Sequence, residues 1–170
     1  GAGDGIGRQL AIQLNRVGCA LWLCDINEEK LAETVKLLSN DRASCQTASV
    51  DMGSKASVYE WAHTIAQQTD SLDLVVNNAG VAYVSTFEDS TDEDFEWLMN
   101  INFWGVVWSS RAFLPLLKSA QTGHLVNVSS VFGMVGIPSQ SAYNAAKFAV
   151  RGFTEALQAE NLNSRLKVSC

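Results

Sequence analysis

The sequence has 170 residues, of which 47% are hydrophobic, and a formal net charge of −6. This length supports one domain with a substantial core, and the acidic balance provides no positive field for a nucleic-acid backbone. No apolar run approaches the roughly eighteen residues of a membrane span, and the start lacks the basic and apolar segments of a secretory signal. We therefore expect a cytoplasmic protein that acts on small molecules, without a nucleic-acid partner or a membrane span.

Helical and strand-like apolar patterns alternate along the whole chain. The predicted elements are, in order, helix 6–17, strand 20–25, helix 27–38, strand 44–50, helix 54–68, strand 72–76, helix 91–118, strand 124–128, helix 142–161 and strand 166–169. The apolar faces of the first two helices are predicted from helical spacing at Ile6, Leu10, Leu14 and Val17, and at Leu31, Val35 and Leu38. This alternation predicts an α/β fold, a Rossmann-like doubly wound parallel sheet with helices on both faces in a three-layer α/β/α arrangement.

Glycines crowd the turn before the first helix, where Gly1, Gly5 and Gly7 follow a G-x-x-x-G-x-G spacing. The backbone N–H groups and dipole of a helix start favour a pyrophosphate, and glycine lets it come close. The stricter G-x-G-x-x-G fingerprint fails because Ile6 stands at its sixth position, and no Gly-Lys-Ser/Thr follows for a P-loop. A tight turn without a ligand remains the alternative.

Asp25 stands twenty residues after Gly5, at the end of a predicted strand. A carboxylate there can accept hydrogen bonds from an adenosine ribose. Its charge would repel a 2′-phosphate, and neither Ile26 nor Asp4 supplies a cation, so we expect NAD to be favoured over NADP. The alternative is that Asp25 only caps the helix that begins near Asn27.

Tyr143 and Lys147 are four residues apart in a predicted helix and therefore lie on one face. An ammonium about 4 Å from a phenolate contributes about 4 kcal/mol at an effective dielectric of about 20, enough for a tyrosine to exchange protons near neutral pH. The pair alone is common on surface helices. However, Ser129 and Ser130 end a strand thirteen residues before Tyr143, at the edge where α/β proteins bind ligands.

This ordered set resembles the classical short-chain dehydrogenase/reductase family, which combines the glycine turn, Asn-Asn-Ala-Gly, a serine and Tyr-x-x-x-Lys at this spacing. The resemblance covers essentially the whole chain and implies an NAD(P)-dependent oxidoreductase that interconverts an alcohol and a ketone or aldehyde. It implies a cofactor site formed by Gly1, Asp4, Gly5, Ile6, Gly7, Asp25, Asp51, Met52, Asn78, Ala79, Gly80, Tyr143 and Lys147. In this site Asp51 and Met52 would contact the adenine edge.

The resemblance also assigns catalytic roles to Asn102, Ser130, Tyr143 and Lys147. Tyr143 would be the acid or base and Ser130 would orient the substrate oxygen. Lys147 would bind the nicotinamide ribose and favour the tyrosine phenolate, while Asn102 would hold a water of a proton relay. In contrast, Ser129 is predicted to be a strand-end hydrogen bonder.

The segment after Ser130 is mostly apolar, with Phe132, Met134, Val135, Ile137 and Pro138 and no Arg or Lys, which favours a small uncharged alcohol or carbonyl substrate. The alternative is that these side chains only pack the domain. The resemblance implies a homodimer or homotetramer through the helical stretch near residues 95–113 and the helix of Tyr143. The cysteines lack metal-ligand spacing, so we expect reduced thiols and no metal.

Both ends suggest a single NAD(P)-binding domain over residues 1–170 that is truncated, without its first strand and its C-terminal substrate-binding part. Two other functions stay open. One is a non-catalytic regulatory or scaffold protein that binds a cofactor on the same fold. The other is a sugar-nucleotide epimerase or dehydratase, which shares Tyr-x-x-x-Lys but expects a different glycine spacing.

Overall fold

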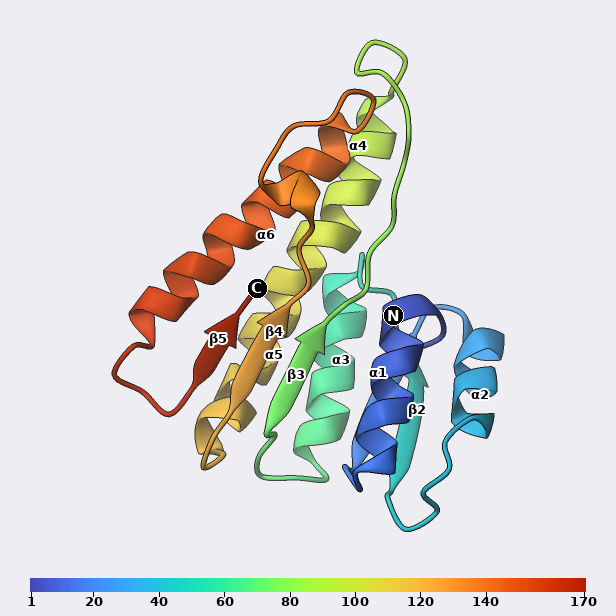
Figure 1. The fold of residues 1–170 in the computed structure, drawn as a ribbon, viewed down its shortest axis with the longest axis vertical. Coiled ribbons are helices and arrows are strands. Elements are labelled where there is room, and N and C mark those ends of the chain that lie inside the picture. Colours follow the sequence, from blue (N-terminus) through green and yellow to red (C-terminus); the bar gives the residue numbers. More distant parts are fainter. The chain divides into compact units, whose positions relative to one another are not determined.

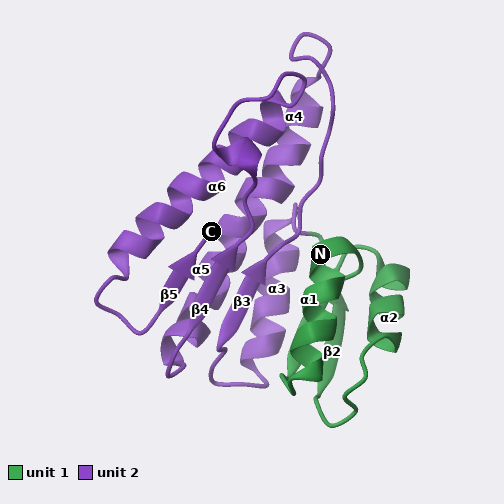
Figure 2. Cartoon of the chain, viewed as in Figure 1, with its two compact units in different colours: residues 1–51 green, residues 52–170 purple.

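The computed structural model describes residues 1–170 and divides into two compact units, residues 1–51 and residues 52–170 (Figure 2). Each unit contains a parallel sheet flanked by helices, as the ribbon shows (Figure 1). None of the helices is long and apolar enough to cross a lipid bilayer. The cysteines are all free, and Cys170 is exposed.

The first unit consists of α1 (Gly5–Arg16), β1 (Leu21–Asp25), α2 (Glu28–Lys36) and β2 (Cys45–Ser49). Strands β1 and β2 are parallel, and their register pairs Leu21 with Cys45 and Asp25 with Ser49. Both helices begin at a side-chain cap, because Asp4 accepts from the N–H of Gly5 and Asn27 accepts from that of Lys30. These caps place the glycine turn and the end of β1 where the predicted cofactor residues lie.

The apolar face predicted for α1 is wrong. Ile6, Leu10 and Val17 are 63%, 37% and 78% exposed, and the buried residues of the helix are Gly7, Ala11, Ile12 and Asn15. Asn15 takes a core position because its Oδ1 accepts from the backbone N–H groups of residues 39 and 40, at 3.0 and 2.9 Å. Buried backbone groups need such partners, and an apolar side chain could not supply them.

The inner face of α2 differs from its prediction in the same way. Val35 is exposed, whereas Leu31 is buried as predicted and Thr34 is fully buried. The hydroxyl of Thr34 donates to the backbone oxygen of Ala2 at 2.9 Å, so a polar contact with the glycine turn fixes this face of the helix.

The second unit is built on a three-stranded parallel sheet in the order β3-β4-β5. Its elements are α3 (Lys55–Ala66), β3 (Leu74–Asn77), α4 (Asp92–Met99), the π-helical η1 (Asn100–Trp104), α5 (Gly105–Ser119), β4 (His124–Asn127), the short 3₁₀ turn η2 (Val131–Gly133), α6 (Ser141–Glu160) and β5 (Lys167–Ser169). Helix α3 packs along α5, α5 contacts β3 and β4, and α6 contacts β4 and β5. The main core cluster between these elements contains Leu117, Leu125, Leu166 and Val168.

The long helix predicted over residues 91–118 is divided by the π-helical segment η1. Here the N–H of Gly105 bonds the carbonyl of Asn100, five residues earlier. A Cβ on Gly105 would lie 2.6 Å from the backbone oxygen of Met52, so only glycine fits where the helix passes that segment. The other predicted elements are confirmed, with ends that shift by at most two residues.

Candidate active site

The glycine turn of the first unit requires glycine at two positions around the start of α1. Gly5 has φ +51°, in the left-handed region that favours glycine. A Cβ on Gly3 would lie 3.0 Å from the carboxylate carbon of Asp25, so this position is also limited to glycine. Gly7 is buried against the unit, whereas Ile6 and Asp4 are exposed beside the turn. The turn therefore presents backbone, and few side chains, at the start of α1.

Asp25 ties the end of β1 to this turn. One carboxylate oxygen accepts from the N–H of Gly3 at 2.8 Å, and the other accepts from the N–H of Asn27 at 2.9 Å. Partial burial opposes the ionisation of Asp25, but these hydrogen bonds and the positive amino group of Gly1, 3.6 Å from the carboxylate, outweigh it and lower the pKa of the carboxyl group. Asp25 is therefore a negatively charged hydrogen-bond acceptor. Its carboxylate bonds the backbone N–H groups of Gly3 and of Asn27 at the same time.

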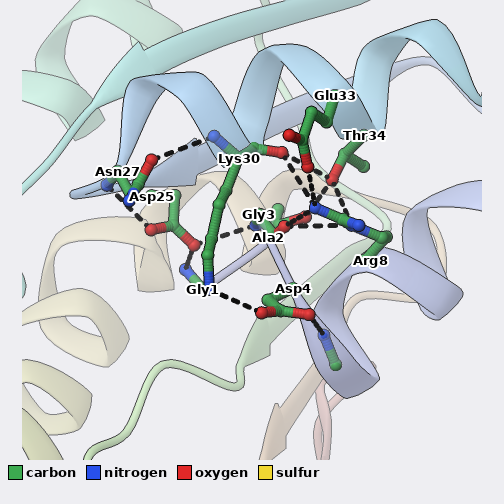
Figure 3. A network of polar contacts seen from close by, with 11 residues as sticks. Gly1, Ala2, Gly3, Asp4, Arg8, Asp25, Asn27, Lys30, Glu33 and Thr34 are labelled. Atoms are coloured by element: carbon green, nitrogen blue, oxygen red, sulfur yellow. Dashed lines mark hydrogen bonds and ion pairs between the residues drawn. The ribbon is translucent and has the colours of Figure 1, made fainter.

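A network of cations around the turn was not expected from the sequence (Figure 3). The ammonium of Lys30 lies 2.7 Å from a carboxylate oxygen of Asp4. The guanidinium of Arg8 donates to the backbone oxygen of Gly3 and lies 3.1 Å from a carboxylate oxygen of Glu33. Two positive charges thus lie beside the turn, and each is paired with a carboxylate.

The predicted adenine-side residues lie where the two units meet in sequence. Asp51 is the last residue of the first unit and is exposed, and Met52 is the first residue of the second. The backbone of Met52 lies against Gly105 of η1 and α5. Their contact with an adenine stays a prediction.

Lys147 is the buried cation of the second unit. It is 4% exposed, and its ammonium donates to the backbone oxygen of Val128 at 2.9 Å. Burial lowers the pKa of Lys147. The ammonium lies 5.6 Å from the ring centroid of Tyr143, so helix α6 brings these two side chains together as the spacing predicted. A Cβ on Gly80 would lie 3.7 Å from the same ammonium.

The two serines at the end of β4 have different partners. The hydroxyl of Ser129 donates to the backbone oxygen of Lys147 at 3.0 Å, which confirms its predicted role as a strand-end hydrogen bonder. The hydroxyl of Ser130 accepts from the N–H of Phe132 at 3.2 Å, and the Phe132 ring meets the Tyr143 ring edge to face at 5.8 Å. The segment that carries Ser130 is thus packed against the side chain of Tyr143.

Asn102 is fully buried in η1, and its side chain already has partners. Its Oδ1 accepts from the N–H of Val81 and its Nδ2 donates to the oxygen of the same residue, both at 2.8 Å. This double contact anchors the segment that follows Asn78, Ala79 and Gly80. These two bonds use one acceptor lone pair and one N–H of the amide, and the predicted contact of Asn102 with a water stays a prediction.

Asn77 belongs to a buried polar chain that links the middle of the sheet to both neighbouring helices. Its amide donates to Oδ1 of Asn127 at 2.8 Å and to the hydroxyl of Ser110 at 3.2 Å. Asn127 in turn donates to the hydroxyl of Thr154 at 3.0 Å. These contacts make Asn77 structural.

Two further residues hold the loop after β4, and sequence reasoning missed both. A Cβ on Gly133 would lie 2.7 Å from the backbone oxygen of Lys147 and 2.7 Å from the hydroxyl oxygen of Ser129. Asn144, next to Tyr143, bonds both backbone groups of Ile137 through its amide. Only the place of Asn144 beside the tyrosine could have drawn attention to it.

The family model described as short chain dehydrogenase matches residues 1–170. The chain belongs to the short-chain dehydrogenase/reductase family. The chain is 43% identical over 172 residues to one curated relative, SadH of Mycobacterium tuberculosis, which is named as an oxidoreductase. It is 36% identical over 168 residues to epidermal retinol dehydrogenase 2 of Homo sapiens. These matches cover 100% and 98% of the chain, but only 62% and 54% of the relatives.

Solved structures of the family share the fold. A short-chain dehydrogenase/reductase from Burkholderia phymatum in complex with NAD has a TM-score of 0.92 and 33% identity, with 98% of this chain and 60% of that chain covered. An alcohol dehydrogenase from Thermococcus sibiricus complexed with 5-hydroxy-NADP has a TM-score of 0.90 and 29% identity, with 98% and 71% covered. The predicted family and the α/β Rossmann-like fold are therefore confirmed.

Proposed function

We propose that the protein carrying this chain is an NAD-dependent alcohol dehydrogenase or carbonyl reductase, with Tyr143 as the general acid or base. The supporting observation is the buried ammonium of Lys147, which lies 5.6 Å from the Tyr143 ring centroid beside the end of β4. A buried charge is costly unless it is paired and hydrogen-bonded. A phenolate of Tyr143 beside this ammonium would pair with it and would be stabilised by its positive charge.

The residues of the first unit fit a dinucleotide. The left-handed φ of Gly5 and the crowding at Gly3 favour glycine at both positions, at the start of a helix whose N–H groups favour a pyrophosphate. The ionised Asp25 offers acceptor oxygens for a ribose hydroxyl. In this proposal Gly1, Asp4, Ile6 and Gly7 complete the phosphate side.

When bound, the nicotinamide accepts or donates a hydride at the substrate carbon. In the oxidation of an alcohol, the phenolate of Tyr143 takes the hydroxyl proton while the carbon loses its hydride, and in the reduction the phenol returns the proton to the carbonyl oxygen. Lys147 stabilises the phenolate, and Ser130 holds the substrate oxygen. Asn102 would hold the water that carries the proton onward.

NAD is the cofactor that we propose, because the charge of Asp25 would repel a phosphate on the ribose. A kcat/KM that is higher with NADP than with NAD would contradict this choice. The exposed apolar side chains after Ser130, with Met134 66% exposed, support an uncharged substrate. Two relatives are named as a retinol dehydrogenase and an estradiol 17-beta-dehydrogenase, names that denote apolar alcohols.

The test is NAD reduction by the whole-length protein with a panel of secondary alcohols, hydroxysteroids, diols and sugar alcohols, and with Tyr143→Phe as the control. We expect turnover of uncharged alcohols and a loss of about 100-fold or more in kcat for the variant. Equal activity of Tyr143→Phe would refute the assigned proton transfer. NAD binding without turnover of any alcohol would favour a regulatory role.

We also propose that the protein forms a homo-oligomer through the aromatic surface of η1 and α5. Trp104 is 44% exposed and stacks on Trp108 at 6.2 Å between ring centroids, with the Phe103 ring beside it. Large exposed aromatic side chains of this kind are typical of interface cores. A monomer in analytical ultracentrifugation at micromolar concentration would contradict the proposal.

A further inference from the structure

The loop between β4 and α6, residues 131–140, is fixed by contacts near its start and near its end. At its start, Gly133 is packed against the backbone of Lys147 and the hydroxyl of Ser129. At its end, the N–H of Ser85 donates to the oxygen of Ser139 at 3.0 Å, and Ser139 has the left-handed φ of 61°. A non-glycine residue keeps this conformation only where its surroundings hold it.

Asn144 makes the contacts that fix the second half of this loop. Its Oδ1 accepts from the N–H of Ile137 at 3.1 Å, and its Nδ2 donates to the oxygen of Ile137 at 3.1 Å. The same Nδ2 also donates to the oxygen of Gln140, whose backbone accepts from the Asn144 N–H at 2.8 Å. The residue is 8% exposed, so these bonds are shielded from water.

An asparagine is suited to this position because its amide carries an acceptor and a donor side by side, and so pairs with both groups of one backbone residue. An aspartate could keep only the bond from the Ile137 N–H, and would face the two carbonyl oxygens without a proton to donate. An alanine would leave both backbone groups of Ile137 without this partner, which is the costly form of losing a hydrogen bond, whereas the oxygen of Gln140 would keep its bond from the backbone N–H of residue 144.

The held loop displays apolar side chains on its outer side. Val131, Met134, Val135 and Ile137 are 62%, 66%, 50% and 36% exposed. These four side chains form an apolar wall on the segment that runs from Ser130 to the start of the helix bearing Tyr143. In the proposed function Ser130 holds the substrate oxygen, so the same segment carries both the residue for that oxygen and the apolar wall. Asn144, which follows Tyr143 on α6, links Ile137 of that wall to the helix.

We propose that Asn144 is a positioning residue that sets the apolar wall of the substrate site, and that this wall selects alcohols with a bulky apolar body. The inference rests on the proposed function. It assigns Asn144 no contact with the reacting atoms: the amide acts through residues 137–140. Loss of the amide therefore affects how tightly the apolar body binds and leaves the proton transfer unchanged.

The experiment compares Asn144→Asp and Asn144→Ala with wild type in the whole-length protein, on a long-chain and a short-chain secondary alcohol. We expect KM for the long-chain alcohol to rise about tenfold, with less than about a threefold change for the short one, since one lost apolar contact is worth about this factor. The pH profile of kcat should stay in place. An unchanged long-chain KM, or an equal loss of kcat on both alcohols, would overturn the proposal.

The matched control is Asn161→Ala. Asn161 lies just after α6, is 9% exposed and donates to the oxygen of Leu157 at 2.8 Å, away from the loop. This variant should lower Tm without changing either KM. A long-chain KM that rises equally in Asn161→Ala would show that loss of stability alone is responsible, and would overturn the positioning role.

Hydrogen exchange separates this inference from the proposed function. In Asn144→Ala the backbone amide of Ile137 should exchange at least about tenfold faster, while those of β4 keep their protection. If wild type oxidises no alcohol, the proposed function fails and the substrate wall fails with it, whatever the exchange shows. If wild type is active but exchange at Ile137 is unchanged, only the role of Asn144 is refuted.

Discussion

Substitution of Gly133 by alanine tests whether the serine segment and helix α6 are in direct contact. The new Cβ would lie 2.7 Å from the backbone oxygen of Lys147 and 2.7 Å from the hydroxyl oxygen of Ser129, about 0.7 Å short of an ordinary contact at 3.4 Å. The hydroxyl can rotate away only by giving up its bond to the Lys147 oxygen. The backbone oxygen can move only if α6 moves with it.

Both routes carry a cost in stability and in geometry. Overpacking of this kind costs about 1–3 kcal/mol. For a domain of more than about 150 residues this lowers Tm by about 2–4 °C per kcal/mol. A displacement near 1 Å of groups flanking the reaction costs about 100-fold in rate. We therefore expect Gly133→Ala to lower kcat by about 10-fold to 100-fold and to lower Tm by several degrees.

The assay is NAD reduction by the whole-length protein, with thermal unfolding measured on the same sample. Gly136→Ala is the control from the same loop, because a Cβ there meets nothing within 4 Å. Gly152→Ala is the control within α6, where a Cβ is equally free and alanine should stabilise the helix by about 0.5–1 kcal/mol. If Gly133→Ala matches Gly136→Ala in kcat and Tm, the close packing is not what holds the serine segment.

Two further predictions concern charges. Burial lowers the pKa of Lys147, so the folded state binds fewer protons than the unfolded state at alkaline pH and wild-type stability gains as pH rises through that range. Lys147→Met should be inactive. Its Tm must fall relative to that of wild type as the pH rises from about pH 7 to pH 10. A Tm difference that stays constant over this range would show that the pKa of Lys147 is not lowered by folding. Asp4→Ser keeps a helix cap but releases the Lys30 ammonium, so the Kd for NADP divided by the Kd for NAD should fall. Asp4→Ser combined with Lys30→Met should restore the wild-type ratio. Titration of tryptophan fluorescence measures both Kd values.

The parts of the site that lie close together in sequence could be predicted from it. The spacing of Gly1, Gly5 and Gly7 and the position of Asp25 after a strand place the turn and the acceptor correctly. Tyr143 and Lys147 share a helical face because four residues make about one turn. In each case the geometry follows from one element or from the end of one strand.

The missed features depend on residues far apart in sequence. Arg8 and Glu33 are 25 residues apart, and no periodic pattern links them. The π-helical segment around Asn102 has no local composition that would distinguish it from α-helix, and the contact that Asn102 makes with Val81 is 21 residues away in sequence. The face of α1 was wrong for a related reason: Asn15 is buried because it serves a distant backbone, whatever its polarity suggests.

Asn15, Asn102 and Asn144 share one function in the fold. Each is buried, lies on a helix and bonds the backbone of an irregular segment, as the amides of Asn102 and Asn144 do with both groups of Val81 and Ile137. Irregular segments lack the hydrogen bonds of a sheet, so these amides supply them and fix the segments without adding strands. An apolar replacement of equal volume would leave the bonded backbone groups unpaired in a buried place, which costs more than the bond itself contributes. The conformation of these irregular segments therefore depends on side chains that hydropathy alone would assign to the surface.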